Sequence, residues 1–207
     1  AQHPDARQID QHGRPHIGHR HMANYNHPAA RDAAHDIVTR LAQHYRDHPA
    51  LCGWQIDNEL TAGESANLNR LYDYHPLTIA RYHADLRARY ESLDALNARW
   101  WNNFWSNAYH TWDEIDPPRP GLSGNTSPAM WLEWMRFRAH NVASFGRDQA
   151  AWLREVDPGF RIGTNVPEVS PLKGVLFGQD YWALCCEMDF IGTDLYVFTG
   201  DAMRDQQ

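Results

Sequence analysis

The residues best placed to do chemistry are Asp57, Asn58 and Glu59, which follow a short, mostly apolar run at residues 51–56. A polar end on such a run is typical of a buried parallel strand whose C-terminal end reaches a functional site. One chemistry that a carboxyl group at such a site can perform is glycoside hydrolysis, which needs two carboxyl groups. One protonates the leaving oxygen, and in retaining enzymes the other attacks the anomeric carbon from about 5–5.5 Å away. The alternative is that Glu59 only caps a loop at a polar strand end.

The elements that must position these residues alternate between strands and helices. We expect strands near residues 51–59, 161–166 and 189–196, and loops at 1–26 and 102–126. Apolar residues at three- and four-residue spacing, with Pro28 and Ser127-Pro128 as helix starts, predict helices at about 28–45, 77–90, 93–101, 128–156 and 180–188. This alternation favours an α/β fold with a parallel sheet, either doubly wound or a (β/α)8 barrel.

The number of strands bears on the domain organisation. A (β/α)8 barrel has eight strands in about 250 residues, and only three strands are expected in this chain of 207 residues. We therefore expect a partial (β/α)8 TIM barrel, with residues 1–207 forming a fragment of one catalytic barrel domain. The alternative is a small three-stranded domain, for which the sequence offers nothing to cover the sheet edges.

Composition and charge exclude some classes of function. The formal net charge of −7 argues against nucleic-acid binding, and no apolar run approaches the ~20 residues that span a bilayer. Nine Trp and nine Tyr fit either a large core or a carbohydrate site. The three Cys, at positions 52, 185 and 186, cannot form a paired disulfide framework and fit a reducing compartment. We expect Cys52, within its apolar run, to lie in the core.

Several motifs occur together in an order that resembles glycoside hydrolase family 42, the β-galactosidases. Residues 53–59 (GWQIDNE) resemble the acid/base strand of that family, and residues 47–50 (DHPA) resemble the connection before it. Upstream lie DQHGR at 10–14, Arg20-His21 and NHP at 26–28; downstream lie LRARY at 86–90, LDALN at 93–97 and FWS at 104–106. The similarity covers nearly the whole chain and depends on the order of the motifs.

The resemblance implies a role for each matching residue. Glu59 would be the general acid/base, with Asn58 beside it on the sugar and Arg20 binding a galactose hydroxyl. Trp105 would line the pocket and present an apolar face to the sugar ring. Taken without the family, Arg20 is better interpreted as a surface loop arginine, and Trp105 is equally a packing residue under a loop. Weaker candidates at the next two strand ends are Asn165, Asp194 and Tyr196.

The sequence departs from the family at a zinc site that some members hold with four Cys. Its first position is Asn24 here, and residues 60–74 contain no Cys, so we expect no metal. The histidines near the start, His12, His16, His19 and His21, do not share one regular face, and we expect a solvated loop there in preference to a metal site.

The remaining expectations also come from the resemblance. The family's nucleophile is a Glu on a later strand, expected beyond Gln207, and neither Glu168 nor Glu187 is assigned to that role. The implied activity is retaining hydrolysis of terminal β-D-galactosides by double displacement, without a cofactor, in a cytoplasmic protein whose full-length form is a homotrimer. The alternatives are a related barrel hydrolase acting on another β-glycoside, and a non-catalytic carbohydrate-binding barrel.

Overall fold

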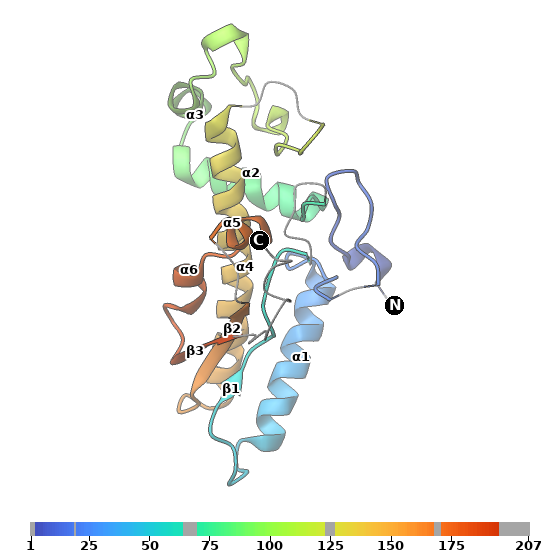
Figure 1. The fold of residues 1–207 in the computed structure, drawn as a ribbon, viewed down its shortest axis with the longest axis vertical. Helices are drawn as coiled ribbons and strands as arrows, with labels where there is room; N and C mark the ends of the chain where they lie inside the picture. Colours follow the sequence, from blue (N-terminus) through green and yellow to red (C-terminus); the bar gives the residue numbers. More distant parts are fainter. Residues whose placement is uncertain (1–2, 19, 64–69, 123–126, 168–170, 195–207) are drawn as a thin grey trace, which may run out of the picture.

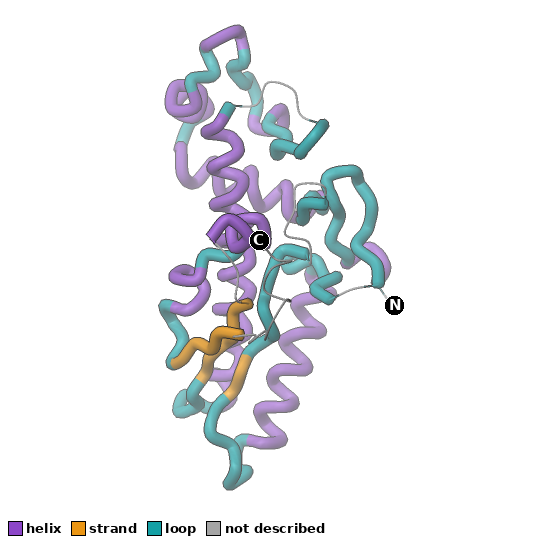
Figure 2. Tube along the Cα trace, viewed as in Figure 1, coloured by secondary structure: helices purple, strands orange, loops and turns teal. Residues whose placement is uncertain are grey.

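A three-stranded parallel sheet organises the chain. The computed structural model describes residues 3–18, 20–63, 70–122, 127–167 and 171–194. The strands β1 (Trp54–Gln55), β2 (Ile162–Pro167) and β3 (Phe190–Asp194) lie side by side in chain order (Figure 1). Trp54 pairs with Ile162, and Gly163 pairs with Phe190. Because the strands are parallel, their C-terminal ends meet at one edge, where the loop shown in teal in Figure 2 continues the chain from β1.

Helices α1 (Pro28–Tyr45), α4 (Pro128–Val156) and α6 (Tyr181–Cys185) pack against this sheet. Ile162 and Val166 of β2 are buried with apolar side chains from these helices: Ala42, Val142, Leu153 and Leu184. The helix starts follow local sequence signals. Pro28 is the first residue of α1. The Ser127 and Asp180 side chains cap α4 and α6, because each accepts a hydrogen bond from the backbone N–H three residues ahead.

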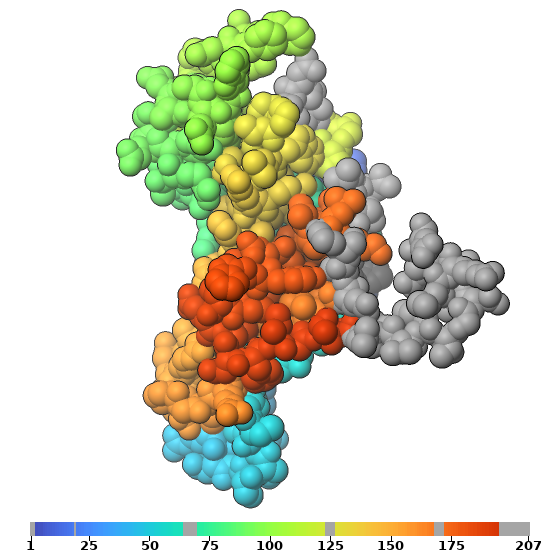
Figure 3. Space-filling model, turned by 60° about the vertical axis from the view of Figure 1, so that its left-hand side comes forward, coloured from blue at the N-terminus to red at the C-terminus, as the bar shows by residue number. Residues whose placement is uncertain are grey.

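The 29-residue helix α4 joins two separate cores. Its C-terminal half covers the sheet, while its N-terminal half packs with α2 (Pro76–Tyr90) and α3 (Leu93–Trp100). Trp134 of α4 is fully buried in this second core, against Tyr82 of α2. In Figure 3, the green region that holds α2 and α3 projects at the end of the molecule away from the sheet. Shorter elements complete the fold: η1 (Pro4–Ala6), η2 (Phe104–Ser106), η3 (Trp112–Glu114) and α5 (Pro171–Phe177).

Three sequence expectations about the fold need correction. The predicted strand at 51–59 is paired only at Trp54–Gln55, because the backbone turns at Asp57, where φ is 51°. Cys52 is exposed rather than in the core, since it precedes the paired part of this strand. Helix α5 was not predicted at all. The third strand is described as far as Asp194, and Tyr196 and Glu168 lie outside the described residues.

The segment before α1 is irregular, as expected, but much of it is buried. Isolated bridges join Arg7 to Ala23 and Ile9 to Pro15. Several polar side chains of this segment are buried: Gln8, Asp10, Gln11, His16 and Asn24. Two of them make hydrogen bonds to a later part of the chain, Gln11 to the Leu71 backbone N–H and Asn24 to Asp73. The expectation of a solvated loop is therefore wrong for His16, because its ring packs against Tyr72 and its Nε2 is bonded to the Arg20 backbone oxygen.

Candidate active site

Three of the predicted site residues come together at the C-terminal edge of the sheet. Arg20 Nη2 donates to Glu59 Oε2 over 2.8 Å and to the backbone oxygen of Asn58 over 3.2 Å. Asn58 Nδ2 lies 3.4 Å from the same Glu59 oxygen. The Glu59 side chain is 16% exposed and the Arg20 side chain 51% exposed. The carboxyl group is thus held by two donors and remains within reach of solvent.

Glu59 sits on a strained turn that follows β1. Asp57 and Glu59 both have φ near 51°, a left-handed conformation that costs a non-glycine residue about 1–2 kcal/mol. Asn165 and Gln55 are among the side chains that hold the turn: Asn165 Oδ1 accepts from the Glu59 backbone N–H over 3.0 Å, and Gln55 Nε2 donates to the Asp57 backbone oxygen over 3.3 Å. This turn directs the Glu59 side chain toward Arg20.

Asn165 and Asp194 bring the second and third strand ends into the same cluster. Asn165 is 7% exposed, and its Nδ2 lies 2.9 and 3.1 Å from the two carboxylate oxygens of Asp194. The same Nδ2 lies 3.3 Å from Asn58 Oδ1. Polar residues from all three strand ends therefore interact around Glu59, as expected where parallel strands end at a site.

Two histidines that the sequence did not single out as site residues fix the position of Arg20 and Asn58. His16 is buried, its ring centroid lies 4.7 Å from that of Tyr72 with the two planes tilted by 48°, and its Nε2 lies 2.9 Å from the Arg20 backbone oxygen. His21 Nε2 lies 3.0 Å from the Asn58 backbone oxygen, and its Nδ1 lies 3.2 Å from Thr61 Oγ1. Their concentration near the start of the chain was visible in the sequence, but their partners were not.

Trp105 is the predicted site residue that the structure does not bring to this cluster. It lies in η2, is 72% exposed and stacks on Phe104 with a centroid distance of 4.9 Å. Among the described residues, its ring contact is with Phe104 and not with the Glu59 cluster.

Asn24, which the family resemblance places at a zinc-ligand position, is bonded to other residues. Its side chain donates to Asp73 Oδ2 and, over 2.7 Å, to Thr78 Oγ1. Burial raises the pKa of Asp73 against the opposing effect of hydrogen bonds from Ile9 and His75. Within the part of the chain that the structure describes, no three His, Cys, Asp or Glu side chains converge to hold a metal. Asn24 offers an amide in place of a thiolate, so its surroundings do not fit zinc.

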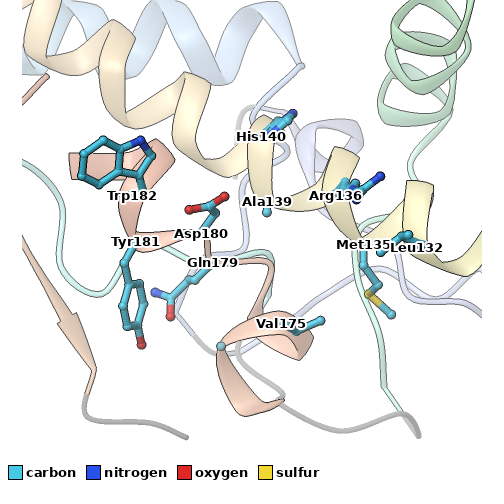
Figure 4. A pocket seen from close by; sticks show the side chains of 11 residues that line it. Leu132, Met135, Arg136, Ala139, His140, Val175, Gln179, Asp180, Tyr181 and Trp182 are labelled. Atoms are coloured by element: carbon cyan, nitrogen blue, oxygen red, sulfur yellow. The ribbon is translucent and has the colours of Figure 1, made fainter. Parts of the chain in front are cut away.

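A separate groove lies away from Glu59, on the outer helical layer. It is bordered by α4, α5 and α6, with Trp182, Met135 and Val175 on its walls (Figure 4). Its lining is mainly apolar and contains none of Arg20, Asn58 or Glu59. The groove is therefore separate from the cluster of Arg20, Asn58 and Glu59.

Comparisons with known proteins show which family the chain belongs to. The family model of glycoside hydrolase family 42, described as beta-galactosidase, matches residues 1–207. The chain belongs to this family. Beta-galactosidase BglY of Alicyclobacillus acidocaldarius is 32% identical over 198 residues, which make up 95% of this chain and 26% of BglY. The chain spans about a quarter of the length of the curated relatives it matches.

Solved structures of family 42 members share the fold. A GH42 beta-galactosidase from G. stearothermophilus has a TM-score of 0.83 at 30% identity, over 97% of this chain and 28% of the other. The beta-galactosidase of the haloarchaeon Halorubrum lacusprofundi has a TM-score of 0.82 at 30% identity, over 94% and 28% of the two chains. The prediction of a partial TIM barrel is confirmed, and the doubly wound alternative is wrong.

None of the helices among the described residues combines the length and apolar character needed to cross a bilayer.

Proposed function

We propose that the full-length protein, a chain of its relatives' length that carries these 207 residues, is a retaining β-galactosidase with Glu59 as proton donor. The observation that carries the proposal is the cluster of Arg20, Asn58 and Glu59 at the C-terminal ends of parallel strands. In TIM barrels, catalytic residues come from this face. The family's curated relatives are named beta-galactosidases, which supports the choice of sugar.

The proposed reaction uses two carboxyl groups in two steps. Glu59, protonated, gives its proton to the glycosidic oxygen while a second carboxylate attacks the anomeric carbon and the leaving group departs. The Glu59 carboxylate then takes a proton from water, whose oxygen attacks the glycosyl-enzyme and releases the sugar with net retention. We place the second carboxylate on a later barrel strand, outside residues 1–207, as the family resemblance implies.

The roles of the neighbouring side chains follow from their contacts. Arg20 donates one N–H to Glu59 and, being half exposed, has further donors for a galactose hydroxyl. Asn58 lies at the surface beside the carboxyl group, where it can contact the sugar 2-hydroxyl. Trp105 is proposed to line the pocket, and Trp105→Ala would then raise KM more than it lowers kcat, because a ring that packs on the sugar contributes binding.

The test is the variant Glu59→Ala in the full-length protein. We expect the hydrolysis of 4-nitrophenyl β-galactoside to fall by roughly 10²–10⁴-fold, the range of general acid–base catalysis. Added azide is expected to restore turnover of an activated substrate such as 2,4-dinitrophenyl β-galactoside, by attacking the glycosyl-enzyme without base assistance. Glu155→Ala, which removes a side chain that is 68% exposed, is the control. Normal turnover by Glu59→Ala would refute the proposal.

The other parts of the proposal have tests of their own. A panel of nitrophenyl β-galactoside, β-glucoside, β-mannoside and β-xyloside distinguishes a β-galactosidase from a barrel hydrolase acting on another sugar. Failure to cleave any of them, with sugar binding retained, would identify a carbohydrate-binding barrel. Light scattering of the purified full-length protein tests the predicted homotrimer, and cell fractionation tests the predicted cytoplasmic location.

A further inference from the structure

The side-chain amide of Asn165 uses all of its hydrogen-bonding capacity within the Glu59 cluster. Its oxygen accepts from the Glu59 backbone N–H and from Gln55 Nε2, each over 3.0 Å. Its nitrogen donates to the Asp194 carboxylate over 2.9 Å and to Asn58 Oδ1 over 3.3 Å. An Asn amide has two donors and an oxygen with two lone pairs, so no part of this group is left for another partner.

The donor and acceptor in each hydrogen bond are fixed by partners of Asn165 that can act only as a donor or only as an acceptor. The Glu59 backbone N–H can only donate and the Asp194 carboxylate accepts, so the Asn165 oxygen must face Glu59 and its nitrogen must face Asp194. The second Asn165 N–H then points to Asn58 Oδ1, which turns the Asn58 nitrogen toward Glu59 Oε2 at 3.4 Å. A chain of hydrogen bonds thus runs from Asp194 through Asn165 and Asn58 to the carboxyl group of Glu59.

We propose that Asn165 is a positioning residue for the acid/base, and that Asp194 is the anchor that orients it. This inference rests on the proposed function of Glu59. Through Asn165, the second and third strands set the conformation of the turn at the end of the first. Asn165 holds Glu59 in two ways. It accepts a hydrogen bond from the Glu59 backbone N–H, where φ is 51°, and it orients the Asn58 amide, which faces the Glu59 carboxyl oxygen. A conformation of this cost persists only where neighbouring groups enforce it.

A polar side chain at a strand end often does no more than cap a loop. Asn165 differs because its partners other than Asp194 all belong to residues 55–59, the strand and turn that carry the acid/base. Removing the amide would let the turn relax, and the carboxyl group would lose its alignment with the glycosidic oxygen. We expect the affinity for the sugar to change less than the rate of proton transfer.

The experiment compares substrates that differ in their need for a proton. In the full-length protein, we measure kcat/KM of Asn165→Ala and Asn165→Asp for 2,4-dinitrophenyl β-galactoside, whose leaving group departs without protonation, and for methyl β-galactoside, whose leaving group requires it. We expect kcat/KM to fall roughly 10- to 100-fold for the methyl galactoside, a share of what general acid catalysis supplies. For the dinitrophenyl galactoside we expect a change below about threefold, because acid catalysis is not needed there. Asn165→Asp keeps the shape but has no N–H to donate, and we expect it to follow Asn165→Ala.

Asn97→Ala is the matched control for a loss of structure. Asn97 is 6% exposed and its amide bonds the Tyr109 backbone, away from the sheet. Any fall in kcat/KM in this variant should be equal for the two substrates, since it would reflect the fraction of folded protein. An equal fall for both substrates in Asn165→Ala would overturn the positioning role.

A double-variant cycle separates this inference from the proposed function. If Asn165 acts through Glu59, Asn165→Ala has no further effect on kcat/KM in the Glu59→Ala background. Asp194→Ala is expected to show the same substrate dependence as Asn165→Ala and no additional loss when combined with it. Full activity of Glu59→Ala would refute the acid/base assignment itself. An inactive Glu59→Ala that azide restores, with an additive effect of Asn165→Ala, would refute the positioning role alone.

Discussion

Arg20 and Glu59 are separated by 39 residues in the sequence, yet Arg20 Nη2 donates to Glu59 Oε2 over 2.8 Å. The arginine comes from the folded segment before α1, and the glutamate from the turn after β1. Because the Glu59 side chain is only 16% exposed, water competes with this bond less than at an open surface. Arg20 is therefore the cation that holds the carboxyl group in place.

We expect Arg20→Ala to lower kcat/KM for 4-nitrophenyl β-galactoside by roughly 10- to 100-fold in the full-length protein, since a hydrogen bond to a charged group contributes about 1.5–3 kcal/mol. Arg20→Lys keeps the charge but not the planar set of donors, and we expect a smaller loss. Steady-state kinetics measure both variants against Arg40→Ala, which removes a side chain that is 76% exposed. Unchanged kcat/KM in Arg20→Ala would contradict the assigned role.

Local rules explain why much of the fold was predictable. The starts of α1 at Pro28 and of α4 after Ser127 are specified by residues at the helix ends themselves. The parallel sheet followed from the alternation of apolar strands with helices, and Glu59 was identified by its place after such a run together with the family motifs. These signals all act within a few residues of one another.

The errors concern residues whose surroundings come from distant parts of the chain. His16 looks like a solvated loop residue in the sequence, but Tyr72 and the Arg20 backbone bury it. Asn165 was only a weak candidate, because its four partners lie in two distant segments, residues 55–59 and Asp194. No local sequence pattern indicates contacts between segments so far apart, so the sequence predicted a role for Glu59 but not most of the contacts that hold it.

Asp73 links the segment before α1 to the start of α2, and its ionisation is expected to affect stability. Its carboxylate accepts from the Ile9 and His75 backbone N–H groups over 2.9 and 3.0 Å, and burial raises its pKa above the ordinary 3.8. Between pH 3.8 and the raised value, the unfolded chain has released this proton and the folded protein still holds it. The free energy of unfolding contributed by Asp73 therefore falls as the pH rises through this window.

Urea unfolding of the wild type and of Asp73→Asn at a series of pH values measures this effect. The asparagine cannot ionise, so the difference in unfolding free energy between wild type and variant is expected to shift in favour of Asp73→Asn as the pH rises from about 3.8. The difference should be constant at lower pH, where the carboxyl group is neutral in both states. A difference that shifts in the opposite direction would show that the folded protein stabilises the ionised form.

Arg138 carries a buried charge that supports the connection between α4 and α5. Its side chain is 2% exposed, donates to the Tyr72 backbone oxygen, and reaches the Leu176 oxygen at the end of α5 over 2.9 Å. Burial lowers the pKa of Arg138 to about 10, so the guanidinium stays charged at neutral pH. We expect Arg138→Leu to cost about 3–5 kcal/mol, because carbonyl groups that it satisfies are left without donors. Arg136→Leu, two positions away with a 51% exposed side chain, is expected to cost less than about 1 kcal/mol in the same urea titration.

Cys185 and Cys186 are adjacent, but their thiols are expected to react at different rates. Burial, reinforced by Cys186, raises the pKa of Cys185 to about 11, whereas Cys186 is exposed. Alkylation requires the thiolate, and a thiol with this pKa is about 0.1% ionised at pH 8. We therefore expect iodoacetamide to modify Cys186 well before Cys185, with the position of the label read from peptide fragmentation spectra.

In Cys186→Ser, raising the pH from 8 to 10 is expected to speed labelling of Cys185 by about 100-fold, because its thiolate fraction grows tenfold per pH unit. In urea-unfolded protein the two cysteines should react at similar rates, so equal rates in the folded protein would show that Cys185 is not protected by burial.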